Sequence, residues 1–312
     1  MKVYLVCVAK NEHKYIKDWF EWHKKFGFDK IVCYNNSDHK PYNINDPLFE
    51  EIDVSEMEAC QLKCYQDFIN KMEFDSWCLF ADVDEFLHCD CNGGTIHEFL
   101  KKFKQCDGVR LNWRVFADCG QLHYDERPVW ERNQIPSPKN CIYNDTLPQG
   151  VYEPYHVKNF YHKSFKPAQA QVHNTLVKGG LFVNACGEHE NGLSPFQMCD
   201  WNGAWLDHYM IKSTEEWCER RLNKIDATGN KIDNDKLVRW YFNLCARTKE
   251  KEEIINAYLN GNSKDIQPVS SECDNVGVSY GTQPGDTEAN SGTDTEVNGT
   301  VHKRVKGRTE GK

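Results

Sequence analysis

Short apolar runs alternate with amphipathic segments through the N-terminal third of this chain, and this alternation constrains its fold more than any other feature. Apolar runs of strand length occupy Lys2–Ala9, Lys30–Tyr34, Trp77–Ala81 and Gly108–Trp113. Segments with apolar residues at helical spacing occupy His13–Phe26, Glu58–Met72 and Thr95–Phe103. Strands that alternate with helices in this way form a mainly parallel sheet with helices on both faces. We therefore expect an α/β fold.

The rest of the chain differs in character. Residues 119–207 are rich in Pro, Gly and His, and we interpret them as irregular, substrate-facing loops. A C-terminal helical cluster is expected at Thr214–Ile225, Asp233–Arg247 and Lys249–Leu259. Beyond residue 260 the composition becomes polar and low in complexity, so residues 261–312 are expected to be a disordered tail. Residues 1–260 are therefore expected to form one domain.

Charge and hydropathy narrow the class of protein. The formal charge of −9 and the pI near 5.8 argue against general binding to nucleic acids or anionic bilayers. The run Val3–Ala9 is far shorter than the ~20 residues of a membrane-spanning helix, and no cleavage site follows it. We therefore expect a cytoplasmic protein whose 15 cysteines are mostly reduced thiols. The basic cluster His302–Arg308 leaves peripheral contact with the inner membrane face open.

Polar side chains follow three of the expected strands at the point where each strand ends. Lys10, Asn11 and Glu12 follow the first strand, Asn35–Asp38 the second and Asp82–Glu85 the third. In open α/β sheets, ligands bind at the carboxyl ends of the parallel strands. Three such clusters at one edge of a sheet are typical of a nucleotide site.

Asp82 and Asp84 are the most informative pair among these residues. In an extended segment their carboxylates point the same way, while Val83 turns back toward the core. Carboxylates a few ångströms apart repel one another unless a positive charge lies between them. Mg²⁺ and Mn²⁺ are hard cations that prefer such oxygen ligands together with diphosphate oxygens. The pair therefore predicts a metal site, although the same residues also occur in solvated acidic turns.

An ordered set of longer motifs adds to these observations. It comprises VAKNEHKYIKDWFEWHKKFGFDKIVCYNNS (Val8–Ser37), WCLFADVDEFL (Trp77–Leu87), NWRVFADCG (Asn112–Gly120), RPVWER (Arg127–Arg132), HKSFKP (His162–Pro167), VHN (Val172–Asn174) and DHYMIKSTEEW (Asp207–Trp217). In this order, and across about residues 3–225, the segments resemble glycosyltransferases of the GT-A fold, in particular family 92 and its bacterial family 2-like relatives. The resemblance implies that residues 1–260 form a GT-A domain.

The resemblance implies transfer of a hexose, with galactose as the first guess, from a nucleotide-diphosphate sugar to a hydroxyl. The donor would be a UDP-sugar, and the acceptor a glycan or a lipid-linked sugar in surface polysaccharide or glycoconjugate synthesis. Contacts to the nucleotide-sugar are implied for Lys10, Asn11, Glu12, Asn36, Asp82 and Lys163. A Mn²⁺ or Mg²⁺ ion is implied at Asp82 and Asp84, with His173 or His208 completing its shell. The ion would stabilise the leaving diphosphate.

Inversion at the anomeric carbon, which the family implies, needs a carboxylate that takes the proton of the acceptor hydroxyl. Asp118, Asp125 and Glu131 are the candidates for this base. Glu131 could equally form an ion pair with its neighbour Arg132.

Two other classes of function remain open. One is a metal-dependent phosphotransferase or nuclease that uses the Asp82/Asp84 pair, although the sequence has no Walker-type glycine-rich loop and no basic patch. The other is a non-catalytic nucleotide-binding or Cys/His module. Cys60/Cys64 and Cys89/Cys91 are the closest cysteine pairs, and neither is followed by a second pair at zinc-ribbon spacing.

Overall fold

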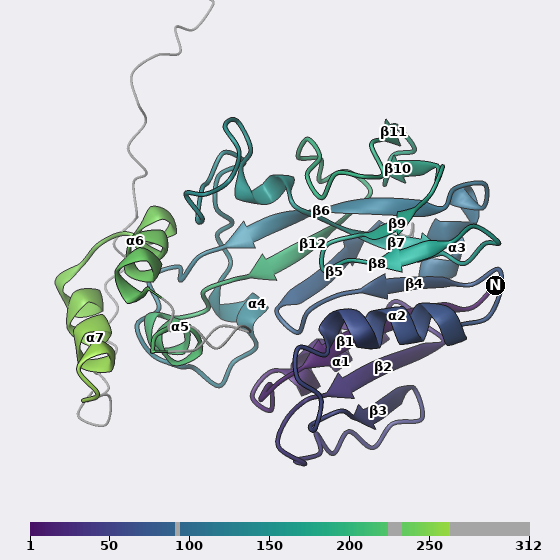
Figure 1. The fold of residues 1–312 in the computed structure, drawn as a ribbon. Helices are drawn as coiled ribbons and strands as arrows, with labels where there is room; N and C mark the ends of the chain where they lie inside the picture. Colours follow the sequence, from purple (N-terminus) through teal and green to yellow (C-terminus); the bar gives the residue numbers. More distant parts are fainter. Residues whose placement is uncertain (91–93, 224–232, 263–312) are drawn as a thin grey trace, which may run out of the picture. The chain divides into compact units, whose positions relative to one another are not determined.

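The computed structural model describes residues 1–90, 94–223 and 233–262 (Figure 1). Its strands are β1 (Val3–Ala9), β2 (Lys30–Asn35), β3 (Phe49–Asp53), β4 (Trp77–Phe80), β5 (Glu85–Cys89), β6 (Gly108–Phe116), β7 (Val157–His162), β8 (Ala168–Ala170), β9 (Thr175–Val177), β10 (Phe182–Asn184), β11 (His189–Glu190) and β12 (Ala204–Tyr209). Its helices are α1 (Ile16–Lys24), α2 (Gln61–Lys71), α3 (Ile96–Leu100), α4 (Val129–Arg132), α5 (Thr214–Arg221), α6 (Asn234–Leu244) and α7 (Lys249–Leu259), with short 3₁₀ turns η1 (Lys101–Phe103) and η2 (Glu153–Tyr155). The expected disordered tail lies outside the described residues, except for Gly261 and Asn262.

The N-terminal part of the sheet follows the predicted alternation. All four expected strands are present, as β1, β2, β4 and β6, and the expected helices between them are α1, α2 and α3. Strands β3, β2, β1 and β4 are parallel neighbours in that order. The strand β3 was not predicted, because its sequence FEEID is mostly charged. An edge strand tolerates such residues, since one side of it faces solvent.

The sheet continues beyond β4 through a strand of opposite direction. Strand β7 pairs antiparallel with both β4 and β6, and β6 pairs parallel with β10 and β12. Strands β7 to β12 all begin within residues 119–207, so the prediction that this region is irregular was wrong for its second part, whereas residues 119–156 contain none of the named strands. All six strands are only two to six residues long, which is too short for a clear alternating pattern.

Helices cover both faces of the sheet, and the side chains of β1 show how. Leu5 and Cys7 pack with α1 in one core cluster, while the intervening Val6 packs with Tyr65 of α2 in the other. Successive residues of a strand point to opposite faces, so one strand supplies both clusters. The predicted fold class, an α/β sheet of mainly parallel strands flanked by helices, is confirmed.

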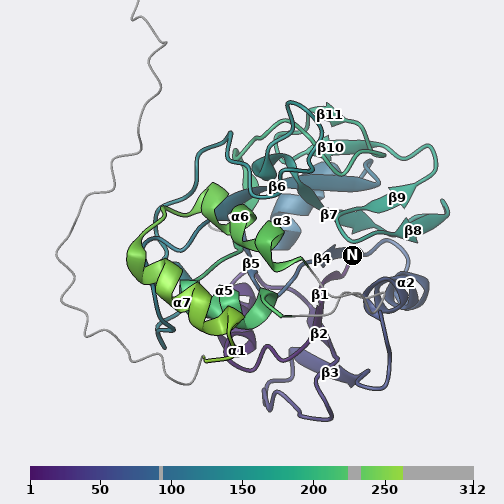
Figure 2. The ribbon, with the colours of Figure 1, turned by 60° about the vertical axis from the view of Figure 1, so that its left-hand side comes forward.

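The C-terminal helices stand at the edge toward which β1, β2, β6 and β12 point (Figures 1 and 2). The hydroxyl of Ser213 accepts the backbone N–H of Glu216 at 3.2 Å, which confirms the predicted helix start there. Helices α5, α6 and α7 share a core cluster of their own that includes Trp217, Tyr241 and Ile254. None of the described helices is both long enough and apolar enough to cross a membrane.

Several thiols serve the packing of this fold. Seven of the described cysteines are buried and free: Cys7, Cys33, Cys60, Cys64, Cys78, Cys218 and Cys245. Burial raises the pKa of the Cys64 thiol to about 12, so it stays protonated at neutral pH. In this state a cysteine acts as a small apolar side chain.

Candidate functional site

A cavity of about 560 Å³ lies at the carboxyl ends of the parallel strands. Residues from β1, β6 and β12, from the loops after β1, β4 and β8 and from the segment around η2 form its walls together with α2, α5 and α6. The lining residues are Val8, Lys10, Glu12, Gln61, Asp82, Val83, Asp84, Trp113, Tyr143, Asn144, Glu153, His156, Val172, His173, His208, Met210, Arg220, Arg221 and Trp240. The cavity thus occupies the edge of the sheet where the sequence predicts ligand binding.

Asp82 lies at the end of β4 and is paired with a lysine that the sequence analysis missed. The ammonium of Lys158 donates to Asp82 Oδ2 at 3.0 Å and to the carbonyl of Val172 at 3.0 Å. Its side chain is 1% exposed, and the same ammonium lies 3.5 Å from the Glu85 carboxylate. Burial raises the pKa of the Glu85 carboxyl to about 8, despite the opposing charge of Lys158. The buried ammonium of Lys158 is stable here because the Asp82 carboxylate pairs with it.

Asp84, two residues further along the chain than Asp82, lies in a second group of charges. Arg220 of α5 donates to Asp84 Oδ2 at 3.0 Å, and the ammonium of Lys212 lies 4.0 Å from the same oxygen. Burial alone raises the pKa of the Asp84 carboxyl, but these cations hold it well below its usual range. Burial and the nearby Arg220 lower the pKa of the Lys212 ammonium to about 8. Protein cations therefore offset both aspartates, a role that the sequence analysis gave to a metal ion.

The two candidate histidines take different places in the cavity. His208 Nε2 lies 3.6 Å from Asp84 Oδ1, whereas His173 packs against Trp113 and His156 with ring centroids 5.3 and 5.1 Å apart. Burial lowers the pKa of His208 to about 3, so its imidazole is neutral and can act as a metal ligand. The described residues hold no group of three or more His, Cys, Asp or Glu side chains in a metal-binding arrangement. One carboxylate and one imidazole still suit Mg²⁺ or Mn²⁺, which are often completed by substrate phosphates and water.

The first two strand-end clusters contribute unequally. Lys10 and Glu12 line the cavity, and Glu12 lies 3.7 Å from Arg220. Asn11 has a φ of 59° and donates its backbone N–H to Ser37 Oγ at 2.7 Å. Asn36 donates to the carbonyls of Val54 and Met57 at 2.6 and 3.0 Å, and so braces the loop after β3. Neither Asn11 nor Asn36 is among the residues that line the cavity.

Lys163 lies at the opposite edge of the sheet, which contradicts its predicted contact with the nucleotide-sugar. It follows directly after β7, and His162 at the end of that strand pairs with Trp77 at the start of β4. The ammonium of Lys163 donates to the carbonyl of Ile69 at 2.5 Å. The reason is strand direction. Because β7 is antiparallel, its beginning reaches the cavity and its end does not, and Lys158 takes the position near Asp82.

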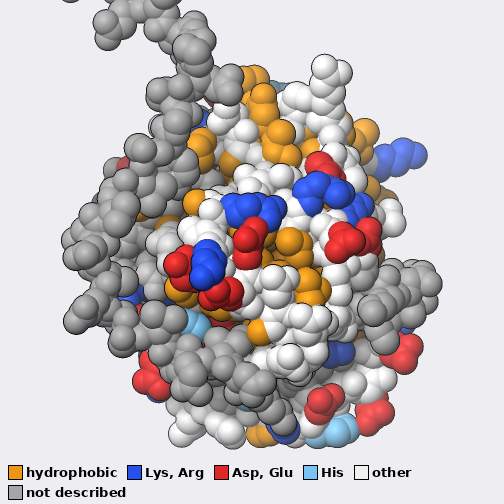
Figure 3. All heavy atoms as spheres, turned by 90° about the vertical axis from the view of Figure 1, so that its left-hand side faces the viewer, with side chains coloured by type: hydrophobic (Ala, Val, Ile, Leu, Met, Phe, Trp, Pro, Cys, Tyr) orange, Lys and Arg blue, Asp and Glu red, His pale blue; other side chains and the backbone are white. Residues whose placement is uncertain are grey.

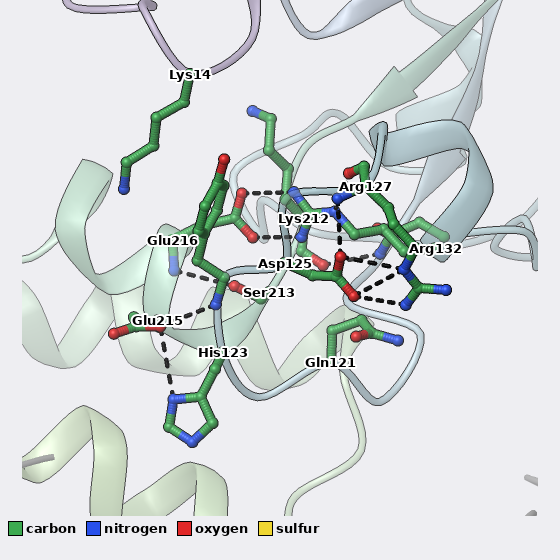
Figure 4. Close-up of polar contacts among 12 residues, drawn as sticks. Lys14, Gln121, His123, Asp125, Arg127, Arg132, Lys212, Ser213, Glu215 and Glu216 are labelled. Atoms are coloured by element: carbon green, nitrogen blue, oxygen red, sulfur yellow. Dashed lines mark hydrogen bonds and ion pairs between the residues drawn. The ribbon is translucent and has the colours of Figure 1, made fainter. Parts of the chain in front are cut away.

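The three base candidates lie outside the cavity lining. Asp118 is buried, with the ammonium of Lys251 at 2.6 Å and the hydroxyl of Tyr241 donating to it at 2.5 Å. Asp125 is bound by the guanidinium of Arg127, at 2.5 Å for the shortest contact (Figure 4). Glu131 is exposed on α4. None of the three predicted bases is therefore among the residues that line the cavity.

Arg132 pairs with Glu216 and not with its neighbour Glu131. Its guanidinium binds both oxygens of Glu216 at 2.6 and 2.8 Å, and both side chains are almost fully buried. Figure 4 shows this fork beside Ser213 and Lys212, with Glu215 held by His123 nearby. Glu216 accepts a further hydrogen bond from Tyr15 at 2.7 Å. The motif DHYMIKSTEEW therefore ties α5 to α1 and α4.

The face that carries the C-terminal helices shows mixed charge. Lys and Arg side chains stand next to Asp and Glu side chains across the visible part of it, around a patch of apolar atoms (Figure 3). Three basic side chains, Lys10, Arg220 and Arg221, line the cavity, and the buried ammonium groups of Lys158 and Lys212 lie against Asp82 and Asp84.

Comparison with known proteins gives limited likenesses. No protein-family model and no curated protein matches the chain. Among solved structures it is similar to residues 1–349 of S. aureus TarS in complex with UDP, at 12% identity and a TM-score of 0.32, over 83% of this chain and 71% of that one. It is also similar to the galactosyltransferase LgtC in complex with donor and acceptor sugar analogs, at 10% identity and a TM-score of 0.32, over 80% of this chain and 99% of that one. These values are too low to place the chain in a family.

Proposed function

We propose that this protein is a metal-dependent glycosyltransferase that moves a hexose from a UDP-sugar to a hydroxyl of a glycan or lipid-linked acceptor, with inversion. One observation carries the proposal. Asp82, Asp84, His208 and Arg220 line the cavity at the carboxyl edge of a mainly parallel sheet, and the buried ammonium groups of Lys158 and Lys212 lie against Asp82 and Asp84. This is the set of charges that a diphosphate with a divalent cation requires.

Different residues would bind the donor and stabilise the leaving group. Asp84 and His208 would hold the Mn²⁺ or Mg²⁺ ion, which supplies a Lewis acid to the diphosphate oxygens when bound. Arg220 and Lys212 carry positive charge beside Asp84, where the negative charge of a departing nucleoside diphosphate develops. Asp82, with a third of its side chain exposed and its other contacts supplied by Gln61 and Lys158, is free to accept a ribose hydroxyl.

The decisive experiment measures UDP binding and UDP release on the full chain. UDP with Mn²⁺ should stabilise the protein by about 2.7 kcal/mol at a hundredfold excess over Kd, and UDP-galactose or UDP-glucose should be turned over slowly with water as acceptor. Asp84→Asn should reduce UDP release by about 10²- to 10³-fold. Asp75→Asn is the matched control, because this carboxylate is 77% exposed at the other end of β4.

Three other results would contradict the proposal or one of its parts. Wild-type protein that neither binds UDP with Mn²⁺ nor releases it from UDP-sugars would overturn the proposal. Equal losses in Asp84→Asn and Asp75→Asn would remove the role given to Asp84. Hydrolysis of phosphodiesters, with no action on UDP-sugars, would instead favour a phosphotransferase or nuclease that uses the same aspartates.

A further inference from the structure

Four carboxylates line the cavity, and three of them are paired with a basic side chain. Asp82 is paired with Lys158 at 3.0 Å, while Asp84 and Glu12 both face Arg220, at 3.0 and 3.7 Å. The fourth, Glu153, has no Lys or Arg partner among the described residues. A carboxylate offset by a fixed cation is a weak proton acceptor, so the four are not equivalent. Glu153 is the cavity carboxylate whose basicity is left intact.

Short contacts hold Glu153 in place in η2, just before β7. Its Oε1 accepts the backbone N–H of Asn144 at 2.8 Å, and its Oε2 lies 3.3 Å from His156 Nδ1. Its own backbone N–H donates to the carbonyl of Cys141 at 3.0 Å. Because η2 precedes an antiparallel strand, these contacts fix the carboxylate at the same sheet edge as Asp82 and Asp84. Its side chain is 3% exposed, and Glu153 is among the residues that line the cavity.

The cavity around Glu153 has aromatic walls. Trp113, Tyr143 and Trp240 line it, on β6, on the loop before η2 and on α6. Trp113 also packs against His208, with ring centroids 4.2 Å apart. A hexopyranose ring has apolar C–H faces and a polar rim, so flat aromatic side chains beside a carboxylate suit an acceptor sugar.

We propose that Glu153 is the base of the transfer reaction, taking the proton of the acceptor hydroxyl as that oxygen attacks the anomeric carbon. The inference rests on the proposed function and adds the missing catalytic residue. The new bond joins the acceptor oxygen to the anomeric carbon, and the bond that breaks joins that carbon to the phosphate oxygen. Its electron pair leaves with the nucleoside diphosphate, and the proton ends on the Glu153 carboxylate.

The surroundings of Glu153 are consistent with this role. Burial raises the pKa of its carboxyl above the ordinary value, although the backbone N–H groups of Asn144 and Tyr143 oppose the shift. Burial also lowers the pKa of His156, so the neighbouring imidazole is neutral rather than a counter-ion. A more basic carboxylate accepts a proton from a hydroxyl more readily.

The test separates a base from a structural brace. Glu153→Gln keeps an oxygen that accepts the Asn144 N–H, so it preserves the brace and removes only the basicity. UDP release from UDP-galactose and UDP-glucose, with water as acceptor, is measured for wild type, Glu153→Gln, Glu153→Ala and the control Glu131→Gln. Sodium azide is then added, because azide attacks the anomeric carbon without giving up a proton.

A base role predicts that Glu153→Gln and Glu153→Ala both lose about 10²- to 10⁴-fold in kcat, with UDP affinity within threefold of wild type. Azide should restore UDP release in Glu153→Ala and yield a glycosyl azide, and Glu131→Gln should behave as wild type. Near-normal kcat in Glu153→Gln, loss of UDP affinity with it, or no response to azide overturns the inference while the proposed function stands. Wild-type protein without UDP binding or release overturns both.

Discussion

Buried polar residues occur in two kinds of place in this molecule, and they differ in what they can reach. The cavity polar groups are Asp82 with Lys158, and Asp84 with Arg220 and His208, all of which line or adjoin open space. The sealed polar groups are Arg132 with Glu216, Asp118 with Lys251 and Tyr241, and His23 in the core. Both kinds are charged or titratable and both are tightly hydrogen-bonded. The cavity polar groups and the sealed polar groups differ only in whether they have access to the cavity.

The difference explains why Asp118 looked like a base. It lies close in sequence to β6, whose end reaches the cavity. In the structure its carboxylate instead joins α7 and α6 to the sheet through Lys251 and Tyr241. An acidic residue near the cavity in sequence can therefore serve the assembly of the fold rather than contact with a ligand.

The sealed pair of Arg132 and Glu216 should give the largest change in stability. Glu216→Gln leaves the Arg132 guanidinium buried without its counter-charge, which typically costs about 3–5 kcal/mol. The midpoint of urea unfolding should fall accordingly, while UDP affinity of the remaining folded protein stays within a few-fold of wild type. A variant with normal stability and lost UDP binding would move Glu216 into the cavity group.

The buried His23 should make stability fall in mild acid. Burial lowers its pKa from 6.5 to about 3, so between these values the unfolded chain binds a proton that the folded chain does not. Stability from this residue is therefore present above pH 6.5 and is lost as the pH falls toward 3, by about 2 kcal/mol between pH 8 and pH 5.

His23→Gln checks this through its unfolding free energy at the two pH values. The variant should lose about 2 kcal/mol less than wild type on going from pH 8 to pH 5. His39→Gln is the control, because this imidazole is 62% exposed and its pKa is raised rather than lowered by Asp53 and Glu56. Parallel losses in wild type and His23→Gln would contradict the assignment.

The hydroxyl of Tyr241 should give the smallest effect. Tyr241→Phe removes one donor to Asp118 but leaves Lys251 in place, so a loss of about 1.5 kcal/mol is expected, the lower end for a hydrogen bond to a charged group. UDP release from UDP-sugars should not change. A tenfold fall in kcat with stability preserved would return Asp118 to the list of catalytic residues.

The fold was predictable to the extent that its elements are long and periodic. Strands β1, β2, β4 and β6 and helices α1 and α2 show clear apolar patterns, and Ser213 marks the start of α5 with a capping signal. The short strands β8 to β11 carry too few residues for such a pattern. Strand β7 is buried at every position although half of its sequence, VKNFYH, is polar, so it shows no alternating pattern, and its direction depends on which strands it pairs with.

The site was predictable where a residue follows a parallel strand directly. Lys10, Glu12, Asp82 and Asp84 all reach the cavity, as does each of the two candidate histidines. Lys158, Arg220 and Glu153 were missed, because they come from an antiparallel strand, a C-terminal helix and a 3₁₀ turn. The one available signal was the lysine between apolar residues in VKNFYH, since a buried ammonium needs a carboxylate partner.

The sequence by itself determined the α/β class, the edge of the sheet that holds the cavity and the two aspartates at its centre. Those follow from local periodicity and from the rule that parallel strands end at a common edge. The tertiary structure decided which charges meet there. Because β7 is antiparallel to β4, Lys163 lies away from the cavity. Asp118 is buried against Lys251 of α7, and His208 rather than His173 lies beside Asp84. Contacts between residues far apart in the chain depend on strand order and direction, which a local pattern does not encode.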